Sequence, residues 1–296
     1  MSGPVPDLRA LSPRRPVASV AEALFSPLAN PGGGMRDRAL RALLAAFGRM
    51  LEVEGAERLS SSAPPVLFAL NHGNASEALL APAAILWLTG GKPVHFLADW
   101  MYLELPLIGR LLRLAEPIPV FGKPARWGWR EEIRQEGLAE SALDRALALL
   151  ARGESVGIFP EGTRNGDPGH LRPGRAGLGE LALRSTAAIV PIGLHYPAAA
   201  RLGRIPRLGR TILRVGEPLD LSAEREQLRG AGFERSARRA LARAVVARTL
   251  AALAELTEKR VAGPNERRAR RPRSAAARKA HAPSFESPLH PGRDTA

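Results

Sequence analysis

The 296-residue chain carries a formal net charge of +14 at pH 7 and contains no cysteine. Its length and its 45% hydrophobic content suit one large globular domain or two smaller ones and exclude wholesale disorder. The lack of cysteine excludes disulfides, thiolate metal sites and cysteine nucleophiles. The positive charge favours an anionic partner, which can be a nucleic acid, a membrane surface or a phosphorylated substrate.

Both ends of the chain are predicted to lie outside the folded domain. Residues 1–35 are rich in Pro and Gly and are interpreted as a flexible lead-in. From Lys259 to the end, ten Lys or Arg stand against three Asp or Glu, which accounts for half of the net charge. Low hydrophobicity predicts a disordered basic tail over residues 261–296, with anion binding as the open alternative. The folded domain is therefore expected over residues 36–260.

No segment is predicted to span a membrane. The longest apolar run, from Leu79 to Leu88, has ten residues and contains Pro82, whereas a spanning helix needs roughly 20. The N-terminal region has no continuous apolar stretch, so it is not a secretory signal. Residues 36–51 have apolar side chains at helical spacing with arginines between them, which predicts a basic amphipathic helix. Such a helix can lie on an anionic bilayer or pack on its own domain.

The middle of the chain alternates between short apolar segments and helical patterns. Because the apolar segments show no polar alternation, they predict strands that are covered on both faces, as in a parallel sheet. The sequence therefore predicts an α/β fold with a mainly parallel central sheet flanked by helices, preceded by the N-terminal amphipathic helix. The expected strands are 66–70, 94–98, 118–120, 155–159 and 187–194. Residues 105–112 are expected to form a turn and a short helix, and the other expected helices are 138–152, 176–184 and 241–256.

A histidine and a carboxylate follow the first of these strands. His72 comes directly after the polar residue that ends the apolar run, and Glu77 stands five residues further on. A neutral imidazole can remove a hydroxyl proton at neutral pH, and a carboxylate on its other nitrogen orients the ring. Asn74 or Ser76 can cap the next helix, with Glu77 in its first turn. The alternative is a His72 that only hydrogen-bonds to loop backbone.

A second polar turn follows the strand predicted at 155–159. Arg164 is suited to bidentate phosphate binding. Gly162 allows backbone amides to approach an oxyanion, and Glu161 can hold a substrate hydroxyl. Because the carboxyl ends of parallel strands are where ligands bind, the two turns together predict a site that activates a hydroxyl on a phosphate-bearing molecule. The alternative is that Glu161 and Arg164 pair with each other.

These residues resemble a known family. Asn71-His72 with a carboxylate at Glu77, then Phe-Pro-Glu-Gly-Thr-Arg at residues 159–164, then Ile-Val-Pro-Ile-Gly at residues 189–193, are similar in order and spacing to the 1-acyl-glycerol-3-phosphate acyltransferase family. Residues 106–120 resemble the segment that this family carries between its first two motifs. The resemblance extends from about Leu40 to about Pro218.

The resemblance implies a peripheral or monotopic O-acyltransferase on the cytoplasmic membrane face, in contact with anionic lipids. It implies His72 as the general base that lets the hydroxyl of a lysophospholipid or glycerol-phosphate-type acceptor attack an acyl thioester. The donor is expected to be acyl-CoA or acyl carrier protein, with no cofactor and no metal. Acceptor binding is implied for Glu161, Gly162, Thr163 and Arg164.

The chain departs from the family pattern at two positions. The first motif usually ends in Asp, and Glu77 stands there; the longer side chain can still reach the imidazole. An Arg usually follows the Ile-Pro-Val segment, and here Phe121-Gly122-Lys123 follows it, so Lys123 or Arg126 is expected to supply the charge. A catalytically impaired lipid-binding protein is therefore an alternative.

Two other classes compete with this reading. Gly153-Glu154-Ser155-Val156-Gly157 matches the serine-hydrolase pattern, but Ser155 is predicted to follow a helix and open a strand, which inverts the required context. A basic nucleic-acid-binding protein fits the charge, yet no recognised binding motif is found and nucleic acid is not expected as a partner. The remaining histidines, which include His95 and His195, show no metal-ligand spacing.

Overall fold

The computed structural model describes residues 51–61, 64–73, 77–89, 92, 94–106, 108–113, 115–122, 131–138, 141–196, 201–202, 205–206, 211–232 and 234–263. The chain divides into Met1–Val261 and Ala262–Ala296, and every described helix and strand belongs to the first of these units. The helix predicted over residues 36–51 lies outside the described residues up to residue 50, and Leu51 is in a strand rather than a helix. The predicted basic tail also lies outside them beyond residue 263.

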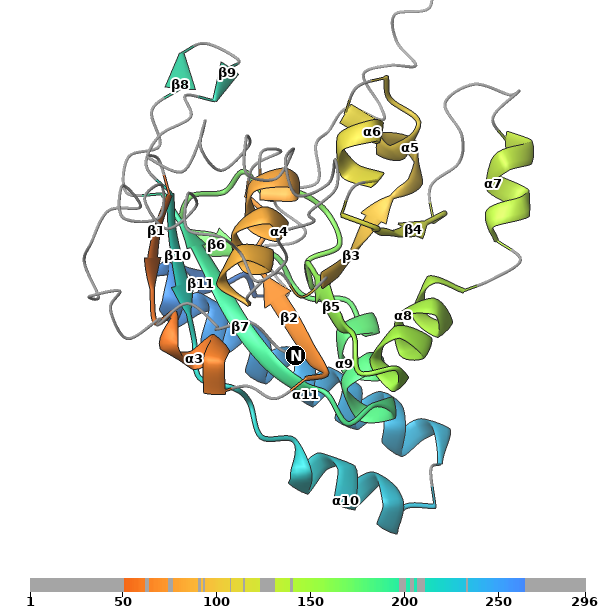
Figure 1. Cartoon of the computed structure of the whole chain (residues 1–296). Helices are drawn as coiled ribbons and strands as arrows, with labels where there is room; N and C mark the ends of the chain where they lie inside the picture. The colour runs from red at the N-terminus through yellow and green to blue at the C-terminus, as the bar shows by residue number, and fades with distance from the viewer. Residues whose placement is uncertain are drawn as a thin grey trace, which may run out of the picture. The chain divides into compact units, whose positions relative to one another are not determined.

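A seven-stranded sheet organises the part of the chain that the structure describes (Figure 1). Strands β7, β2, β5, β3 and β4 are mutually parallel, β10 is antiparallel to β7, and β1 is parallel to β10. The predicted α/β fold with a mainly parallel sheet is confirmed. In order across the sheet the strands are β1 (Leu51–Glu54), β10 (Thr211–Val215), β7 (Ala188–His195), β2 (Val66–Leu70), β5 (Ser155–Ile158), β3 (Val94–Asp99) and β4 (Ile118–Val120).

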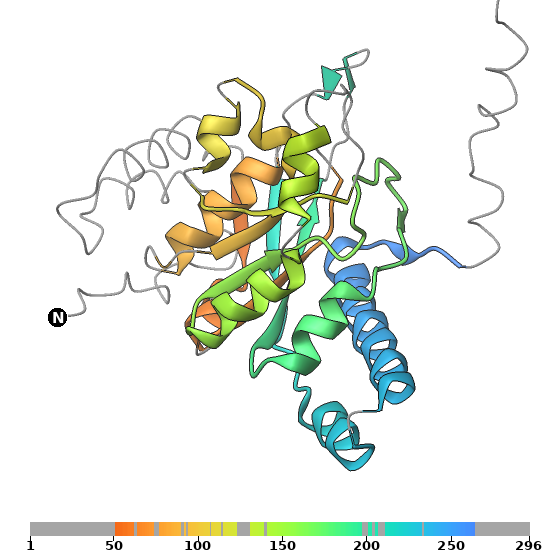
Figure 2. The ribbon, with the colours of Figure 1, turned by 90° about the vertical axis from the view of Figure 1, so that its right-hand side faces the viewer.

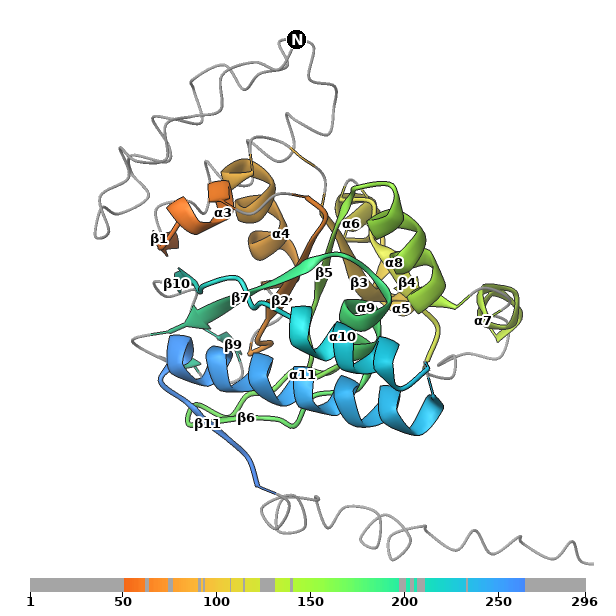
Figure 3. The same ribbon diagram turned by 90° about the horizontal axis from the view of Figure 1, so that it is seen from below.

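Helices cover both faces of the sheet, as the views in Figure 2 and Figure 3 show. Helices α3 (Glu57–Ser61) and α4 (Glu77–Leu88) lie on one face; α8 (Ala142–Ala151), α9 (Gly177–Arg184), α10 (Ser222–Gly230) and α11 (Arg235–Thr257) lie on the other. None of the described helices is both long and apolar enough to cross a membrane.

The central strand β2 is buried on both faces, which explains why its sequence does not alternate between apolar and polar residues. Phe68 and Leu70 pack into the core on the α4 side, whereas Leu67 and Ala69 pack into the core on the α9 and α11 side. Successive side chains of a strand point to opposite faces, so a strand covered twice must be apolar at every position. Full burial of a side chain as large as Leu67 or Phe68 stabilises the fold by about 1.5–3 kcal/mol.

Short elements surround the sheet. The two-residue strands β6 and β11 pair in parallel, and β8 and β9 pair in antiparallel. Helix α5 directly follows β3, and it was not predicted from the sequence. These elements are α5 (Trp100–Leu103), α6 (Ile108–Arg113), α7 (Glu131–Gly137), β6 (His170–Leu171), β8 (Arg201–Leu202), β9 (Ile205–Pro206) and β11 (Arg260–Val261).

Two helix starts differ from the sequence prediction. The helix predicted over residues 138–152 begins at Ala142, because the Ser141 side chain accepts a hydrogen bond from the Leu143 amide and caps it. The helix predicted to begin at residue 241 begins at Arg235, where the Glu234 carboxylate accepts a hydrogen bond from the Ala237 amide. In both cases a polar cap, rather than the apolar periodicity, sets the first turn.

A hydrogen bond between the side chains of His95 and Glu154 connects the starts of β3 and β5. The His95 ring is buried; its Nδ1 lies 2.9 Å from the Glu116 carbonyl oxygen and its Nε2 lies 2.8 Å from Glu154 Oε2. Arg152 Nε donates a hydrogen bond to Glu154 Oε1 at 2.8 Å. The hydrogen bond from Arg152, followed by that from His95, holds the pKa of the Glu154 carboxyl below its usual value.

We expect Glu154→Gln to destabilise the protein by about 1–3 kcal/mol at neutral pH, because it removes a charged acceptor from a buried ring. A carboxyl group whose pKa is lowered by folding stabilises the native state fully above its unfolded pKa and loses this effect as pH falls through the folded value. The difference between wild type and variant in urea unfolding should therefore shrink below about pH 4. Glu226→Gln, at an exposed pair with Arg229, serves as control; a pH-independent difference for Glu154→Gln would contradict the assignment.

Candidate active site

The carboxyl ends of the parallel strands bring the two polar turns together. The loop after β2 carries His72, and the loop after the neighbouring strand β5 carries Glu161 and Arg164. The Asn165 amide donates a hydrogen bond to the His72 carbonyl oxygen at 2.6 Å. The two loops are therefore in direct contact at the edge where open α/β sheets bind their ligands, as the sequence hypothesis required.

Asn71 fastens the first loop to the sheet. Its side chain is 1% exposed; Nδ2 donates to the Leu194 carbonyl oxygen at 3.1 Å, and Oδ1 accepts from the Leu194 amide at 2.6 Å. The side-chain amide of Asn71 thus replaces the main-chain hydrogen bonds that would otherwise continue the pairing of β2 with β7. The residue before His72 is in this way fixed to the neighbouring strand. Sequence reasoning did not assign this role, although a polar side chain directly after a fully apolar strand is a signal for it.

His72 is held through both its main chain and its ring. The His72 amide donates a hydrogen bond to Glu161 Oε1 at 3.0 Å, and its carbonyl oxygen is the acceptor for Asn165. The half-buried imidazole stacks on the ring of Phe159, with centroids 4.4 Å apart and an interplanar angle of 27°. The second loop therefore determines where the His72 backbone and ring lie.

Glu161 points into the protein rather than outward. The residue is 3% exposed, and its second carboxylate oxygen, Oε2, accepts a hydrogen bond from the Arg172 amide at 2.8 Å. Both oxygens thus accept main-chain hydrogen bonds, one from each of two separate segments. Among the described residues no ion pair joins Glu161 to Arg164, so the pairing that the sequence left open is not formed. Direct substrate binding by Glu161 stays a prediction.

A tight turn presents the second loop. The Gly162 amide donates to the Phe159 carbonyl oxygen at 2.9 Å, with Pro160 at the second position, where its fixed φ favours such a turn. Gly162 has φ +64°, and a Cβ there would lie 2.4 Å from the Arg175 side chain. The Arg175 amide closes the base of the loop on the Pro160 carbonyl oxygen at 2.8 Å. Glycine at position 162 is therefore favoured by its backbone angle, whereas the exposed Arg175 side chain can move to make space.

Arg164 lies exposed at the same edge and meets a third segment. Its Nη2 donates a hydrogen bond to the Tyr102 hydroxyl at 3.2 Å, and Tyr102 belongs to α5, which follows β3. The half-buried Thr163 precedes it in the loop. Loops after three adjacent parallel strands, β2, β5 and β3, thus supply this edge of the sheet. Sequence reasoning missed Tyr102 because nothing in the chain indicated α5.

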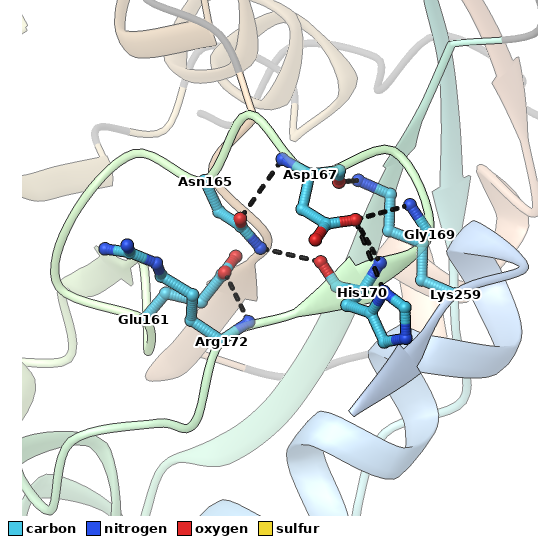
Figure 4. Close-up of polar contacts among 7 residues, drawn as sticks. All are labelled: Glu161, Asn165, Asp167, Gly169, His170, Arg172 and Lys259. Atoms are coloured by element: carbon cyan, nitrogen blue, oxygen red, sulfur yellow. Dashed lines mark hydrogen bonds and ion pairs between the residues drawn. The ribbon is translucent and has the colours of Figure 1, made fainter. Parts of the chain in front are cut away.

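The rest of the second loop is braced from the end of α11 (Figure 4). Asn165 is 7% exposed; its Nδ2 donates to the His170 carbonyl oxygen at 2.7 Å and its Oδ1 accepts from the Asp167 amide at 3.2 Å. Lys259 Nζ donates to the Asp167 carbonyl oxygen at 3.2 Å, and the Arg260 amide donates to the Gly169 carbonyl oxygen at 2.9 Å. Strand β11 then pairs with β6.

Two predicted site residues cannot be placed from the described side chains. Glu77 is the first residue of α4, in the predicted helix, but its side chain and the capping residues 74–76 lie outside the described part. Lys123 also lies outside it, directly after the described Phe121 and Gly122. The roles of Glu77 and Lys123 therefore stay predictions.

His195 and Ser155 both have structural partners. His195 Nδ1 lies 3.2 Å from the Thr257 carbonyl oxygen, and no group of three potential metal ligands is found among the described residues. Ser155 opens β5, and its Oγ accepts a hydrogen bond from the Val66 amide at 3.2 Å. Because Ser155 stands at the amino end of its strand, it lies at the opposite edge of the sheet from His72, which excludes a nucleophile elbow served by this histidine.

The family model and the relatives that match this chain are all named as acyltransferases. Residues 50–195 match the model of the family described as Acyltransferase. The chloroplastic 1-acyl-sn-glycerol-3-phosphate acyltransferase LPAT1 of Arabidopsis thaliana is 31% identical over 144 residues, which are 49% of this chain and 35% of that protein. The 1-acyl-sn-glycerol-3-phosphate acyltransferase of Bacillus subtilis is 26% identical over 126 residues, 43% of this chain and 54% of that protein.

The matched part thus spans only about a third to a half of these relatives' length. Among solved structures, the 1-acyl-sn-glycerophosphate acyltransferase PlsC from Thermotoga maritima aligns with a TM-score of 0.47 and 19% identity, over 71% of this chain and 78% of that one. The family resemblance of the sequence motifs is confirmed: residues 50–195 match the Acyltransferase family model, and the relatives are named 1-acyl-sn-glycerol-3-phosphate acyltransferases.

Proposed function

We propose that the protein is an O-acyltransferase that moves a fatty acyl group from an acyl thioester to a hydroxyl of a lysophospholipid or glycerol-phosphate-type acceptor. The observation that carries this proposal is the hydrogen-bonded contact between the loop of His72 and the loop of Arg164. It brings a proton acceptor and an anion-binding group to one edge of the sheet. The names of the relatives, all 1-acyl-sn-glycerol-3-phosphate acyltransferases, support the same acceptor class.

In this proposal His72 is the general base. Its neutral imidazole takes the proton of the acceptor hydroxyl while the oxygen attacks the thioester carbonyl. The new C–O bond forms, the C–S bond breaks, and the thiolate of the donor leaves with the proton returned by the imidazolium. Glu77 serves to orient the ring and stabilise its positive charge. Since a thiolate is a good leaving group, the enzyme acts chiefly by aligning the reactants and activating the oxygen, with no covalent acyl-enzyme and no cofactor.

Arg164 is proposed to bind the acceptor phosphate. A guanidinium carries five N–H donors in a planar fork, and among the described residues the Tyr102 hydroxyl takes one of them. This contact orients the Arg164 side chain while the other donors face the ligand. Thr163 and Gly162 complete the same loop, and Lys123, which follows β4, is proposed to add a second positive charge. Glu161 is proposed to contribute from within the loop.

The donor is proposed to be acyl-CoA or acyl carrier protein, reached from the cytoplasmic face of a membrane with anionic lipids. Two exposed apolar residues in and after α5, Tyr102 at 41% and Leu105 at 37%, support peripheral contact with lipid at this edge. The exposed Arg110 on α6 adds positive charge beside them. Aromatic and basic side chains together favour the headgroup region of a bilayer.

We expect His72→Ala to lower kcat by about 10²–10⁴ without loss of the fold, because proton removal by a positioned base contributes about that factor. The measurement is acyl transfer from labelled acyl-CoA and from acyl carrier protein to a panel of lysolipid acceptors. Ser155→Ala is the control, and it should transfer at a near-normal rate. A His72→Ala enzyme at the wild-type rate would refute the base, and a wild type that binds lysolipids without turnover would refute the enzyme.

Arg164→Ala should chiefly raise KM for a phosphorylated acceptor, by about 10-fold or more, since charged hydrogen bonds to the ligand are lost. Tyr102→Phe should raise the same KM less, because it removes only the contact that orients the guanidinium. Arg184→Ala, at an exposed arginine near Asp144 on α8, is the matched control. If KM for acceptors with and without phosphate responds equally to Arg164→Ala, the phosphate sits elsewhere.

A further inference from the structure

The peptide groups on both sides of the His72 Cα are held by buried groups of the second loop. The N–H of His72 meets the Glu161 carboxylate, and its C=O meets the amide of Asn165. Resting on the proposed function, we propose that Glu161 and Asn165 are positioning residues, which hold the His72 imidazole where it meets the acceptor hydroxyl. Neither of them needs to touch the substrate for this role.

The Glu161 carboxylate is suited to this task because, among the described residues, main-chain amides compensate its burial. A buried carboxylate is costly unless hydrogen bonds to it replace water. Two main-chain amides, of His72 and Arg172, provide these bonds, at 3.0 and 2.8 Å. Hydrogen bonds to an ionised acceptor are stronger than neutral ones. The carboxylate therefore ties the loop of His72 to the far end of the second loop.

Asn165 acts from the other side through its main chain, while its side chain fixes that main chain. Both polar atoms of the side chain are used within the loop, Nδ2 on the His170 carbonyl and Oδ1 on the Asp167 amide (Figure 4). Asp167 Oδ1 in turn accepts from the Gly169 and His170 amides, at 2.9 and 3.1 Å. Hydrogen bonds within the loop therefore fix its main chain. They orient the main-chain N–H of Asn165 toward the His72 carbonyl oxygen.

The position of the ring follows from these contacts. With its main chain fixed, His72 has only its side-chain torsions left, and stacking on Phe159 restricts those. A general base must lie within hydrogen-bond reach of the proton it removes, and a misplacement of about 1 Å can cost about 100-fold in rate. Loosening either contact should therefore lower the rate of the chemical step more than the affinity for the acceptor.

Two substitutions of nearly unchanged shape test the proposal. Glu161→Gln leaves one good acceptor for two amides, and Asn165→Asp replaces the donor to the His170 carbonyl with a carboxylate oxygen. Each should lower kcat per folded molecule at least about 10-fold and change KM for the acceptor by less than about 3-fold. On a His72→Ala background neither should lower the residual rate further, because both act through the same imidazole.

Thr249→Val is the matched control for lost stability. Thr249 is buried in α11, and its hydroxyl donates within that helix to the Val245 carbonyl oxygen at 2.9 Å rather than to either loop. This variant should be destabilised by a similar amount while its kcat per folded molecule stays normal. Amide hydrogen exchange gives a readout without turnover: the His72 and residue 165 amides should exchange at least about 10-fold faster in both loop variants.

The outcomes separate this inference from the proposed function. If the wild type shows no acyl transfer, or if the His72→Ala variant is fully active, the proposed function is wrong. Faster exchange of the two amides would still show that Glu161 and Asn165 hold the His72 main chain in place. Normal kcat in the loop variants, additive losses with His72→Ala, or unchanged exchange overturns the positioning role. If Glu161→Gln instead raises KM for the acceptor at constant kcat, Glu161 is a substrate ligand and the inference fails.

Discussion

The site depends on one contact, that between the loops which leave the adjacent parallel strands β2 and β5. The His72 N–H donates a hydrogen bond to the Glu161 carboxylate, and the His72 carbonyl oxygen accepts one from the Asn165 main-chain N–H. A single residue is thus bonded to both ends of the segment 161–165, which lies far away in the chain. Three neighbouring residues support this contact. Asn71 fastens the first loop to β7, Arg175 closes the second loop, and Gly162 adopts the positive φ of its turn.

The sheet makes such a contact possible because its central strands are buried on both faces and run in the same direction. Parallel pairing of β2 with β5 places the carboxyl ends of both strands at one edge. The layers of helices on either face fix the strands by packing, with alternate side chains of β2 contributing to each core. The loops can therefore be polar and shaped for chemistry, since the fold does not rely on them for its apolar burial.

Much of this arrangement could be predicted from the sequence, because it follows from composition over short windows. Uniformly apolar segments indicated the parallel strands, and the turns at His72 and Arg164 indicated the edge that carries the site. What the sequence could not show is where a side chain turns. The Glu161 carboxylate accepts hydrogen bonds from two main-chain amides, which the sequence did not indicate, and Tyr102 reaches Arg164 from a helix with no sequence signal. Such directions depend on contacts between distant segments, which local patterns do not encode.

Strand β11 and the end of α11 lie beyond residues 50–195, yet they support the loop that carries Arg164. Strand β10 likewise covers the outer side of β7, and buried α11 residues such as Val245 and Leu253 complete the core behind the sheet. An excised piece limited to the family-matched residues would expose a strand edge and an apolar sheet face. The boundary of the family match and the boundary of the packed core are thus different, and anyone grafting or shortening this protein has to respect the second.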